Sequence, residues 1–490
     1  MLKKILSIFT IATICIGFVA CNSDDDEEAQ IITSLSNTMI TSFSIVENDD
    51  VLENLDSVYF TIDQLRAKIY NADSLPYGTD VSKLVVSIEA NNCSVADLYV
   101  PRKNNTDTIF SYIEHSTDSI DFSLGTVKLR VVSANGKAER TYAIDVNVHK
   151  TQPDSLYWNT FARRDLPSSF YAPTEQKTIQ CGEKAYCLTS NGNEYCIAVT
   201  DDPYGSWDLN NIAFSFSPDI NSFNATDNAL YILDINGNLY TSSNGGIDWT
   251  MCNEVWNYIY GGYNDILLGA KKENGTYYHV TYPASKMAEV ADNCPISGTS
   301  QLVTTSSKWS EKPQAMFIGG ICANGELTGD TWAYDGETWA KINNNATIPA
   351  LKGMTLFAYY SYKVDSNDWS AKKHDTWVAM LGKNTTGTAQ KTVYISLDQG
   401  IHWKVADDLM QLPQYIPAIN NAQVLVYNTT VKARSTSDWE EYSSNHISRA
   451  TKPITEWECP YIYLFGGENS QLYNSVWRGV INRLSYKPII

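Results

Sequence analysis

Short runs of alternating apolar and polar residues fill the first third of the chain. The clearest runs are residues 40–45, 58–62, 84–88, 127–131 and 142–148. Alternation with a period of two places every second side chain on one face, which is typical of a strand that buries one face. About 120 residues of this pattern predict an immunoglobulin-like β-sandwich over residues 31–150. It lacks the Cys–Trp–Cys core of antibody domains, so we expect it to act as a spacer or stalk.

A repeat built on glycine and tryptophan marks the rest of the chain. Residues 396–403 give its full form, S-x-D-x-G-x-x-W, and residues 242–249 repeat it with Asn in place of Asp. Residues 331–339 are a variant that follows a diglycine strand, and a second diglycine strand spans residues 463–467. These residues resemble the Asp-box and kelch repeats of β-propellers. The acid or amide accepts backbone N–H bonds, the glycine takes a positive φ and the tryptophan packs between blades, so the repeat predicts a fold and not an activity.

The spacing of this repeat predicts a seven-bladed β-propeller over residues 153–490, with six blades as the alternative. Outer strands are expected at Trp207, Trp249, residues 287–290, Trp339, Trp403 and Trp439. Seven blades of about 48 residues agree with the usual length of such repeats. The last blade needs one more strand, which residues 156–161 at the start of the domain can supply. A strand from the other terminus would close the ring and remove the exposed sheet edges.

The N-terminus has the organisation of an export signal. Lys3 and Lys4 precede an apolar stretch that ends at Ala20, directly before Cys21. Residues 1–20 are therefore predicted to be a secretory signal peptide rather than a membrane span. The stretch resembles a bacterial lipobox, which implies that Cys21 is acylated and anchors the mature chain. The alternative is an ordinary signal peptide beside an unrelated cysteine.

Residues 21–30 form an acidic tether with the sequence Asn-Ser-Asp-Asp-Asp-Glu-Glu after the cysteine. A block of like charges is solvated and disordered by default. The tether also resembles the acidic export signal of Bacteroidota lipoproteins, which implies a lipid-anchored protein on the outer face of the cell outer membrane. A plain linker facing the periplasm is the alternative.

Charge and composition narrow the classes of function. The chain has 36 basic and 55 acidic residues and a net charge of −19, which becomes −21 when residues 1–20 leave with their two lysines. A field of that sign repels nucleic acid, so a nucleic-acid partner is excluded. All thirteen tryptophans lie at or after Trp158. This break in composition predicts a domain boundary at residues 151–154.

Residues that commonly bind metals or form disulfides give few signals. None of the eight cysteines left after Cys15 and Cys21 shows C-x-x-C spacing, and the six histidines show no ligand spacing. No metal or cofactor is therefore predicted. A two-residue turn at 191–192 would make Cys187 and Cys196 cross-strand neighbours, either as a disulfide or as two reduced core residues.

Five Asp-Ser/Thr-apolar triplets resemble the acceptor motif of Bacteroidota O-glycosylation. Their hydroxyl residues are Ser57, Ser74, Thr108, Ser119 and Ser155. All five lie in the predicted sandwich and the hinge that follows it. The resemblance implies glycans on these hydroxyls, whereas the plainer interpretation is that Asp-Ser often begins a strand after a turn.

No catalytic residue can be assigned from the sequence. The chain has neither a G-x-S-x-G elbow nor a phosphate-binding glycine loop. A sialidase needs three arginines that converge on a carboxylate, but no arginine occurs between Arg164 and Arg434. A triad drawn from the early blades is therefore impossible, and an enzyme becomes a less favoured class.

Three predicted blades carry long segments between their first and second strands, at residues 306–314, 363–374 and 451–459. Each contains one tryptophan outside the repeat, namely Trp309, Trp369 and Trp457. Loops held by a rigid scaffold often carry function. Because these loops share one face of a propeller, we expect the three rings to form a recognition surface for sugars or partner side chains. The alternative is that each ring packs on its own loop.

The whole layout resembles Bacteroidota surface lipoproteins of the domain-of-unknown-function family 6242, which brings no known activity. Three functions remain: a surface module that binds glycan or protein, a glycan-active hydrolase or lyase, and a structural subunit of a surface complex. A binding module predicts exposed aromatic side chains, and an enzyme predicts charged groups that converge in the central funnel. A subunit predicts a broad apolar patch. We expect the binding module.

Overall fold

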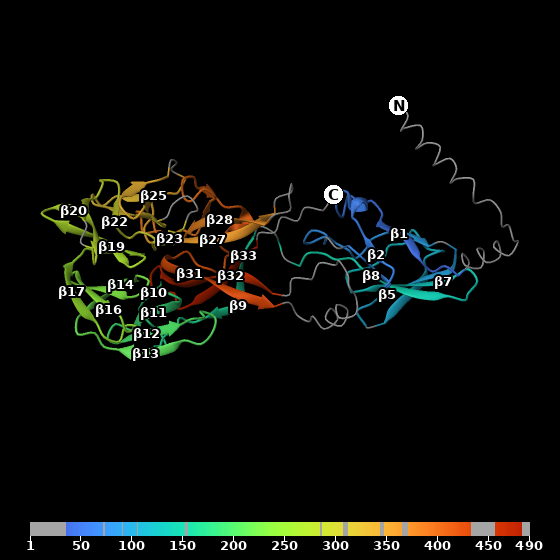
Figure 1. Ribbon diagram of the computed structural model, residues 1–490, viewed down its shortest axis with the longest axis horizontal. Helices are drawn as coiled ribbons and strands as arrows, with labels where there is room; N and C mark the ends of the chain where they lie inside the picture. Colours follow the sequence, from blue (N-terminus) through green and yellow to red (C-terminus); the bar gives the residue numbers. More distant parts are fainter. Residues whose placement is uncertain are drawn as a thin grey trace, which may run out of the picture. The chain divides into compact units, whose positions relative to one another are not determined.

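The computed structural model of the chain describes residues 36–71, 74–90, 92–104, 106–150, 152, 155–284, 287–306, 312–343, 347–364, 371–432 and 456–482. The chain divides into two compact units, residues 1–153 with 486–490 and residues 154–485. Strands dominate both units (Figure 1), and the described helical elements are two short 3₁₀ turns, η1 (Leu55–Ser57) and η2 (Asp408–Met410). The described chain is therefore all-β, as the alternation of apolar and polar residues predicts.

The first unit contains two sheets around one core. The small sheet pairs β1 (Ile40–Ile45) with β4 (Val86–Ala90). The large sheet has the order β2 (Thr61–Asp63), β3 (Lys68–Tyr70), β8 (Glu139–Asp145), β7 (Val127–Ser133), β5 (Cys93–Pro101) and β6 (Asp107–Ser111). Only the β3–β8 pair of these described strands is parallel. Phe43, Leu98 and Tyr142 belong to one buried cluster, so both sheets cover the same core.

The described residues of the second unit form six sheets, which we number one to six from β10. Sheet one contains β10 (Glu175–Cys181), β11 (Lys184–Ser190), β12 (Tyr195–Thr200) and β13 (Asp208–Ile212). Sheet two contains β14 (Pro218–Ala225), β15 (Leu230–Asp234), β16 (Asn238–Ser242) and β17 (Thr250–Val255). Sheet three contains β18 (Tyr258–Tyr263), β19 (Ile266–Glu273), β20 (Thr276–Tyr282) and β21 (Met287–Glu289). Sheet four begins with β22 (Pro295–Ser297) and β23 (Val303–Thr305), which both pair with β24 (Gln314–Cys322), and continues with β25 (Leu327–Tyr334) and β26 (Trp339–Lys341). Sheet five contains β27 (Thr355–Val364), β28 (Ala371–Met380), β29 (Val393–Ser396) and β30 (Lys404–Val405). Sheet six contains β31 (Asn420–Lys432), β32 (Glu456–Glu468), β33 (Val476–Asn482) and β9 (Ser155–Arg164). Each innermost strand contacts that of the next sheet, and β31 contacts β10, so the sheets form a closed ring.

Sheet six takes its strands from both ends of the second unit. β9 and β33 belong to the same sheet (Figure 1) and pair antiparallel, with Trp158 opposite Gly479 in the register. A Cβ on Gly479 would lie 2.7 Å from Cε3 of the Trp158 ring, so glycine is needed to leave room for the indole. Trp158 is 1% exposed. The predicted closing strand at residues 156–161 is confirmed by this pairing.

The prediction of seven blades is wrong for the described residues. It assigned the segment around Trp439 to the outer strand of a separate blade. Instead β31 and β32 pair with each other along their length, from the Asn420–Glu468 pair to the Lys432–Glu456 pair. These long strands are the first two of one sheet, whose outer strand is β9. Trp439 therefore belongs to the connection between β31 and β32, which lies outside the described residues.

The glycine–tryptophan repeat forms the turn between the third and fourth strands of a sheet. In its full form the backbone N–H of Gly400 donates to Ser396 Oγ (2.8 Å) and that of His402 donates to Asp398 Oδ1 (2.9 Å). The same two bonds recur where Asn replaces Asp in sheet two. Trp403 is 3% exposed and packs in the core shared with sheet four. This geometry agrees with the structural role predicted for the repeat.

The predicted pairing of Cys187 with Cys196 is wrong. The loop between β11 and β12 has four residues instead of two, because Asn191 Oδ1 accepts hydrogen bonds from two backbone N–H groups of the loop. Cys187 therefore faces Ala198, and Cys196 faces Thr189. Both thiols are buried and free, and burial raises the pKa of Cys187 to about 12.

The five predicted glycosylation residues differ in their surroundings. Ser155 is buried in β9 and accepts a hydrogen bond from Asn482 Nδ2 (3.4 Å). Burial disfavours modification of this hydroxyl in the folded chain, and glycosylation of Ser155 stays a prediction. The others are exposed (Ser57, Ser119) or half-buried (Ser74, Thr108). Glycosylation of these four residues stays a prediction.

We expect closure by β9 to be a major source of stability for the second unit. Trp158→Ala should lower its free energy of unfolding by about 3–5 kcal/mol, because a fully buried indole is lost. Tyr157→Ala is the control, since its neighbouring side chain is 54% exposed, and it should cost less than about 1 kcal/mol. Urea unfolding followed by tryptophan fluorescence reports this unit alone, because it holds all thirteen tryptophans. Equal effects of the two substitutions would contradict the expectation.

Candidate functional site

A central cavity of about 420 Å³ is lined by the innermost strands of all six sheets. Side-chain amides occupy the free edge of β31. Gln301 of sheet four donates to Val424 O (2.7 Å) and accepts from Val424 N (2.9 Å). Gln423 Oε1 accepts from Gln176 Nε2 (2.6 Å) and Thr178 N (3.1 Å) of sheet one. These bonds satisfy backbone groups that an inner edge would otherwise expose.

Charged side chains are few in the described lining of the central cavity, where they are Lys177 and Asp227. Burial lowers the pKa of Lys177 to about 8, while Asp219 opposes this shift. The described lining therefore holds no carboxylate pair that could act as acid and base. The described residues also contain no group of three or more His, Cys, Asp or Glu that could hold a metal ion.

A second cavity of about 490 Å³, here called the aromatic groove, lies between the outer strands of sheets three and four. Its lining includes His279, Met287, Ala288, Trp332, Tyr334 and Trp339. The first three belong to β20 and β21, and the last three belong to β25 and β26. Two neighbouring sheets thus contribute aromatic side chains to one concave surface.

The half-buried indole of Trp339 is held on several sides. Its ring stacks on His279 with centroids 5.2 Å apart and planes at 19°. Tyr334 and Phe317 pack against it with centroid distances of 5.2 and 5.1 Å. Asp335 fixes the preceding turn, because its carboxylate accepts two backbone N–H bonds of 2.7 and 2.8 Å, which lower its pKa. The indole is therefore a rigid part of the groove.

Two buried polar atoms of the groove have no hydrogen-bond partner among the described residues. They are His279 Nδ1 and Trp332 Nε1, on side chains that are 7% and 5% exposed. Burial lowers the pKa of His279 to about 4, so the imidazole is neutral at pH 7. Buried polar groups rarely stay unpaired. His279 Nδ1 and Trp332 Nε1 thus lie buried in the wall of the groove with their hydrogen-bonding capacity unused among the described residues.

The recognition surface predicted for Trp309, Trp369 and Trp457 would be built from side chains that lie outside the described residues. Trp309 and Trp369 lie outside the described residues. The backbone of Trp457 belongs to β32 opposite Val431, but its side chain lies outside the described part. The segments do connect the first and second strands of sheets four, five and six. A recognition surface made by these rings therefore stays a prediction.

Sequence reasoning missed the aromatic groove although it singled out one of its residues. Trp339 was predicted to be the packing residue of an outer strand, which is part of its role. His279 shows no ligand spacing in the sequence. The two rings meet because sheets three and four are neighbours in the ring. No local pattern reports that contact.

A closed ring of six sheets, preceded by a unit of two sheets, defines the chain as a β-propeller protein with an N-terminal β-domain. The chain belongs to the DUF6242 family. The DUF6242 beta propeller domain matches residues 152–489, and the DUF6242 N-terminal domain matches residues 32–146. The family resemblance seen in the sequence is thereby confirmed.

Several solved structures are similar in fold at low identity. The structure of YCF48 bound to D1 peptide is 11% identical with a TM-score of 0.33, covering 68% of this chain and 98% of that chain. The N-terminal domain of Nup159 is 11% identical with a TM-score of 0.31, covering 68% and 97%. The SapL1 lectin in complex with alpha methyl fucoside is 10% identical with a TM-score of 0.31, covering 63% and 96%. No curated protein matches the chain.

Burial of His279 predicts a pH-dependent stability of the second unit. Its folded pKa of about 4 lies below the ordinary 6.5, so the unfolded chain takes up the proton first as pH falls. Stability is therefore lost between pH 6.5 and about 4, by about 2 kcal/mol from pH 7 to pH 5. His279→Phe keeps a ring against Trp339 and should reduce this loss, while the exposed His402→Gln should not. Urea unfolding at both pH values measures the effect, and the same loss in all three proteins would refute it.

Proposed function

We propose that the chain is a recognition module whose propeller binds a glycan in the aromatic groove. The observation that carries this proposal is the rigid Trp339 indole beside two buried, unpaired polar atoms, His279 Nδ1 and Trp332 Nε1. A sugar ring presents an apolar C–H face and polar hydroxyl edges. The indole suits the C–H face of the sugar, and the nitrogen atoms of His279 and Trp332 suit its hydroxyls. Binding pockets usually combine an apolar lining with a few polar groups in this way.

The other two functions have less support. An enzyme would need charged groups converging at one point, but the described lining of the central cavity offers one ammonium and one carboxylate. A structural subunit would need a broad apolar patch. The most exposed large apolar side chains of the second unit include Phe161, Ile235 and Leu397, which belong to sheets six, two and five. Sheet two is not a neighbour of sheet five or six, so these three side chains do not support one broad apolar patch.

The proposal places this module on the outer face of the outer membrane. Its support is the signal peptide of residues 1–20, the lipobox cysteine Cys21 and the acidic tether. No helix in the described part of the chain is long and apolar enough to cross a membrane. In this account the first unit is an immunoglobulin-like spacer, which its two sheets around one core support.

Filling the groove should abolish glycan binding. The full chain in detergent is screened on a glycan array, and the best oligosaccharide is titrated by calorimetry. Ala288→Trp adds an indole from an exposed position of the groove and should weaken binding at least tenfold, as should Trp339→Ala. Ile247→Trp adds the same side chain at a 62% exposed position of sheet two and should leave binding unchanged. Full affinity in Ala288→Trp would rule out the groove, and cleavage of the oligosaccharide would favour the enzyme.

Removal of the anchor cysteine should release the protein from the membrane. Cys21→Ser should lose incorporation of labelled palmitate and move to the soluble fraction, because no acyl chains remain to hold it. Cys93→Ser, in the first unit, is the control and should behave as the natural chain. External protease should digest the natural protein on intact cells. Protection from that protease would contradict the outward orientation, and palmitate on Cys21→Ser would contradict the anchor.

A further inference from the structure

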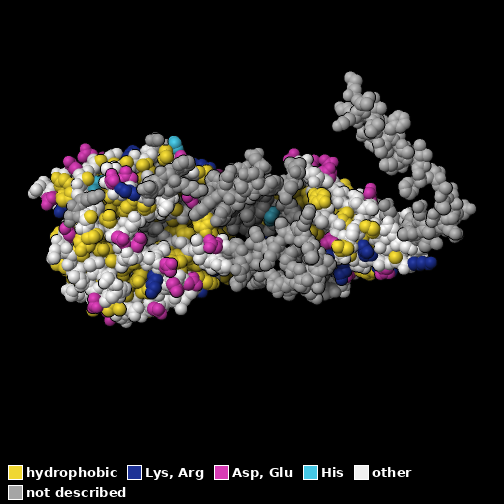
Figure 2. Space-filling model, viewed as in Figure 1, with side chains coloured by type: hydrophobic (Ala, Val, Ile, Leu, Met, Phe, Trp, Pro, Cys, Tyr) yellow, Lys and Arg dark blue, Asp and Glu magenta, His cyan; other side chains and the backbone are white. Residues whose placement is uncertain are grey.

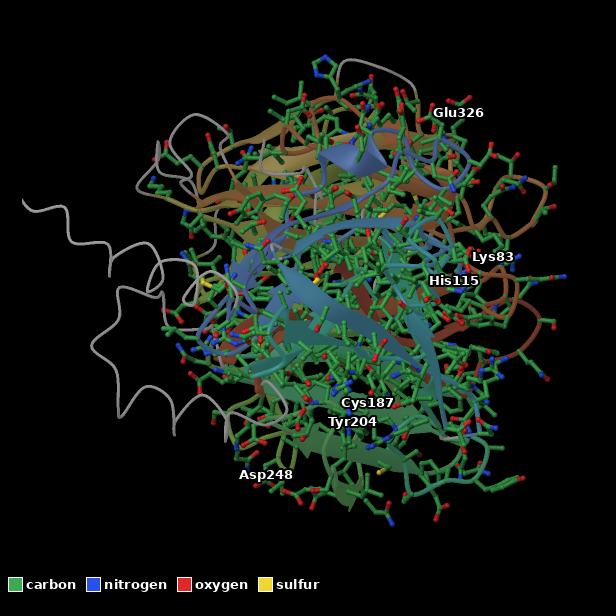
Figure 3. The ribbon with its side chains drawn as sticks, turned by 90° about the vertical axis from the view of Figure 1, so that its right-hand side faces the viewer. Lys83, His115, Cys187, Tyr204, Asp248 and Glu326 are labelled. Carbon is green, nitrogen blue, oxygen red and sulfur yellow. The ribbon has the colours of Figure 1, made fainter. Side chains whose placement is uncertain are left out.

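A pocket of about 250 Å³ lies where sheet six meets sheet one. Its walls are β9 and β33 on one side and the turn between β12 and β13 on the other. Tyr204, labelled in Figure 3, comes from that turn. This pocket is separate from the aromatic groove, which lies between sheets three and four.

Two arginines lie against the Tyr204 ring in this pocket. The guanidinium carbon of Arg164 is 4.4 Å from the ring centroid, and that of Arg478 is 4.2 Å from it. Arg164 also donates to the carbonyl oxygen of Tyr204 (2.5 Å), which fixes its direction. Arg478 lies 3.5 Å from the centroid of Tyr461 as well. Aromatic faces attract cations, so these rings hold two like charges close together.

These cations have no ionic partner in the described chain. Neither Arg164 nor Arg478 forms an ion pair with a described carboxylate, although the chain carries 55 acidic residues. Acidic side chains are spread over the face of the second unit seen in Figure 2. The pocket lining itself includes Asp165, which is exposed. Asp202, in the same turn as Tyr204, instead accepts the backbone N–H of Tyr204 (3.0 Å).

Two donor atoms of the pocket, one of them on Arg478, are buried and unpaired among the described residues. Tyr463 is 2% exposed, lines the pocket, and its hydroxyl has no partner among the described residues. Burial raises the pKa of Tyr463 to about 12, so its hydroxyl remains a donor at neutral pH. Arg478 Nε is also buried without a partner in the described part. Buried donors in a native site call for an acceptor.

We propose that this pocket binds the carboxylate of an acidic sugar. Guanidinium groups pair with carboxylates by two parallel hydrogen bonds, and the Tyr463 hydroxyl supplies a third donor. Much of the remaining lining, including Leu166, Trp207 and Val476, is apolar and suits the C–H face of a sugar ring. An inorganic anion would leave this apolar part of the pocket without a contact. The inference therefore goes beyond glycan binding in the aromatic groove and assigns a second site with a different ligand class.

The test compares trigalacturonate, galactotriose and inorganic phosphate by calorimetry on the full chain in detergent. Trigalacturonate should bind at least tenfold more tightly than the other two, and more weakly at high salt. Arg164→Gln changes an exposed side chain and should weaken this binding at least tenfold. Arg478→Lys keeps the charge but loses the two-pronged geometry, so it should weaken binding too.

Arg163→Gln is the matched control, because Arg163 is next to Arg164 but lies over Trp477. It should leave trigalacturonate binding unchanged. Ala288→Trp, which fills the aromatic groove, should also leave it unchanged, so failure of this site and failure of the groove are distinguishable. Equal binding of trigalacturonate and galactotriose would overturn the proposal. Equal binding of phosphate, or full affinity in a folded Arg164→Gln, would overturn it as well.

Discussion

The pairing of β9 with β33 is the interaction on which the ring of the second unit depends, because it joins the two ends of the unit in one sheet. The outer edge of sheet six is completed by β9, which arrives from the other end of the unit and pairs with β33. At the inner edge, the Gln301 amide bonds the backbone of Val424, and Gln423 Oε1 accepts a hydrogen bond from Gln176 of sheet one. An incomplete sheet six would leave an unpaired edge and a gap beside sheet one. The central cavity, the aromatic groove and the pocket between sheets six and one all depend on this closed ring.

Both candidate sites lie between neighbouring sheets at turns that join third and fourth strands. Asp335 holds the turn before Trp339, and Asp202 holds the turn that carries Tyr204. These carboxylates bond backbone N–H groups of their own turns, so they position aromatic rings instead of reacting. A frame of this kind favours recognition, because it fixes side chains from two sheets before any ligand arrives. The described lining of the central cavity offers no comparable set of converging groups.

Much of the fold could be predicted from local patterns, but contacts between distant segments could not. Residues 40–45 were predicted as a strand and form β1 with the same bounds, although a bulge interrupts the pairing between Ile40 and Ser42. β5 was missed because apolar Val95 and Tyr99 on its less buried face interrupt the alternation of apolar and polar residues. The blade count failed at β31 and β32, since a tryptophan between two long strands imitates the repeat. The aromatic groove could not be predicted at all, because His279 and Trp339 are brought together by the packing of two sheets.

The central claim is that a glycan occupies the aromatic groove, and a crystal structure of the chain with its best array oligosaccharide tests it most directly. The account predicts a sugar ring against the Trp339 indole. A hydroxyl of that sugar should lie about 3 Å from His279 Nδ1 or Trp332 Nε1, which is hydrogen-bonding distance. A sugar bound in the central cavity beside Lys177, with the groove empty, would contradict the account.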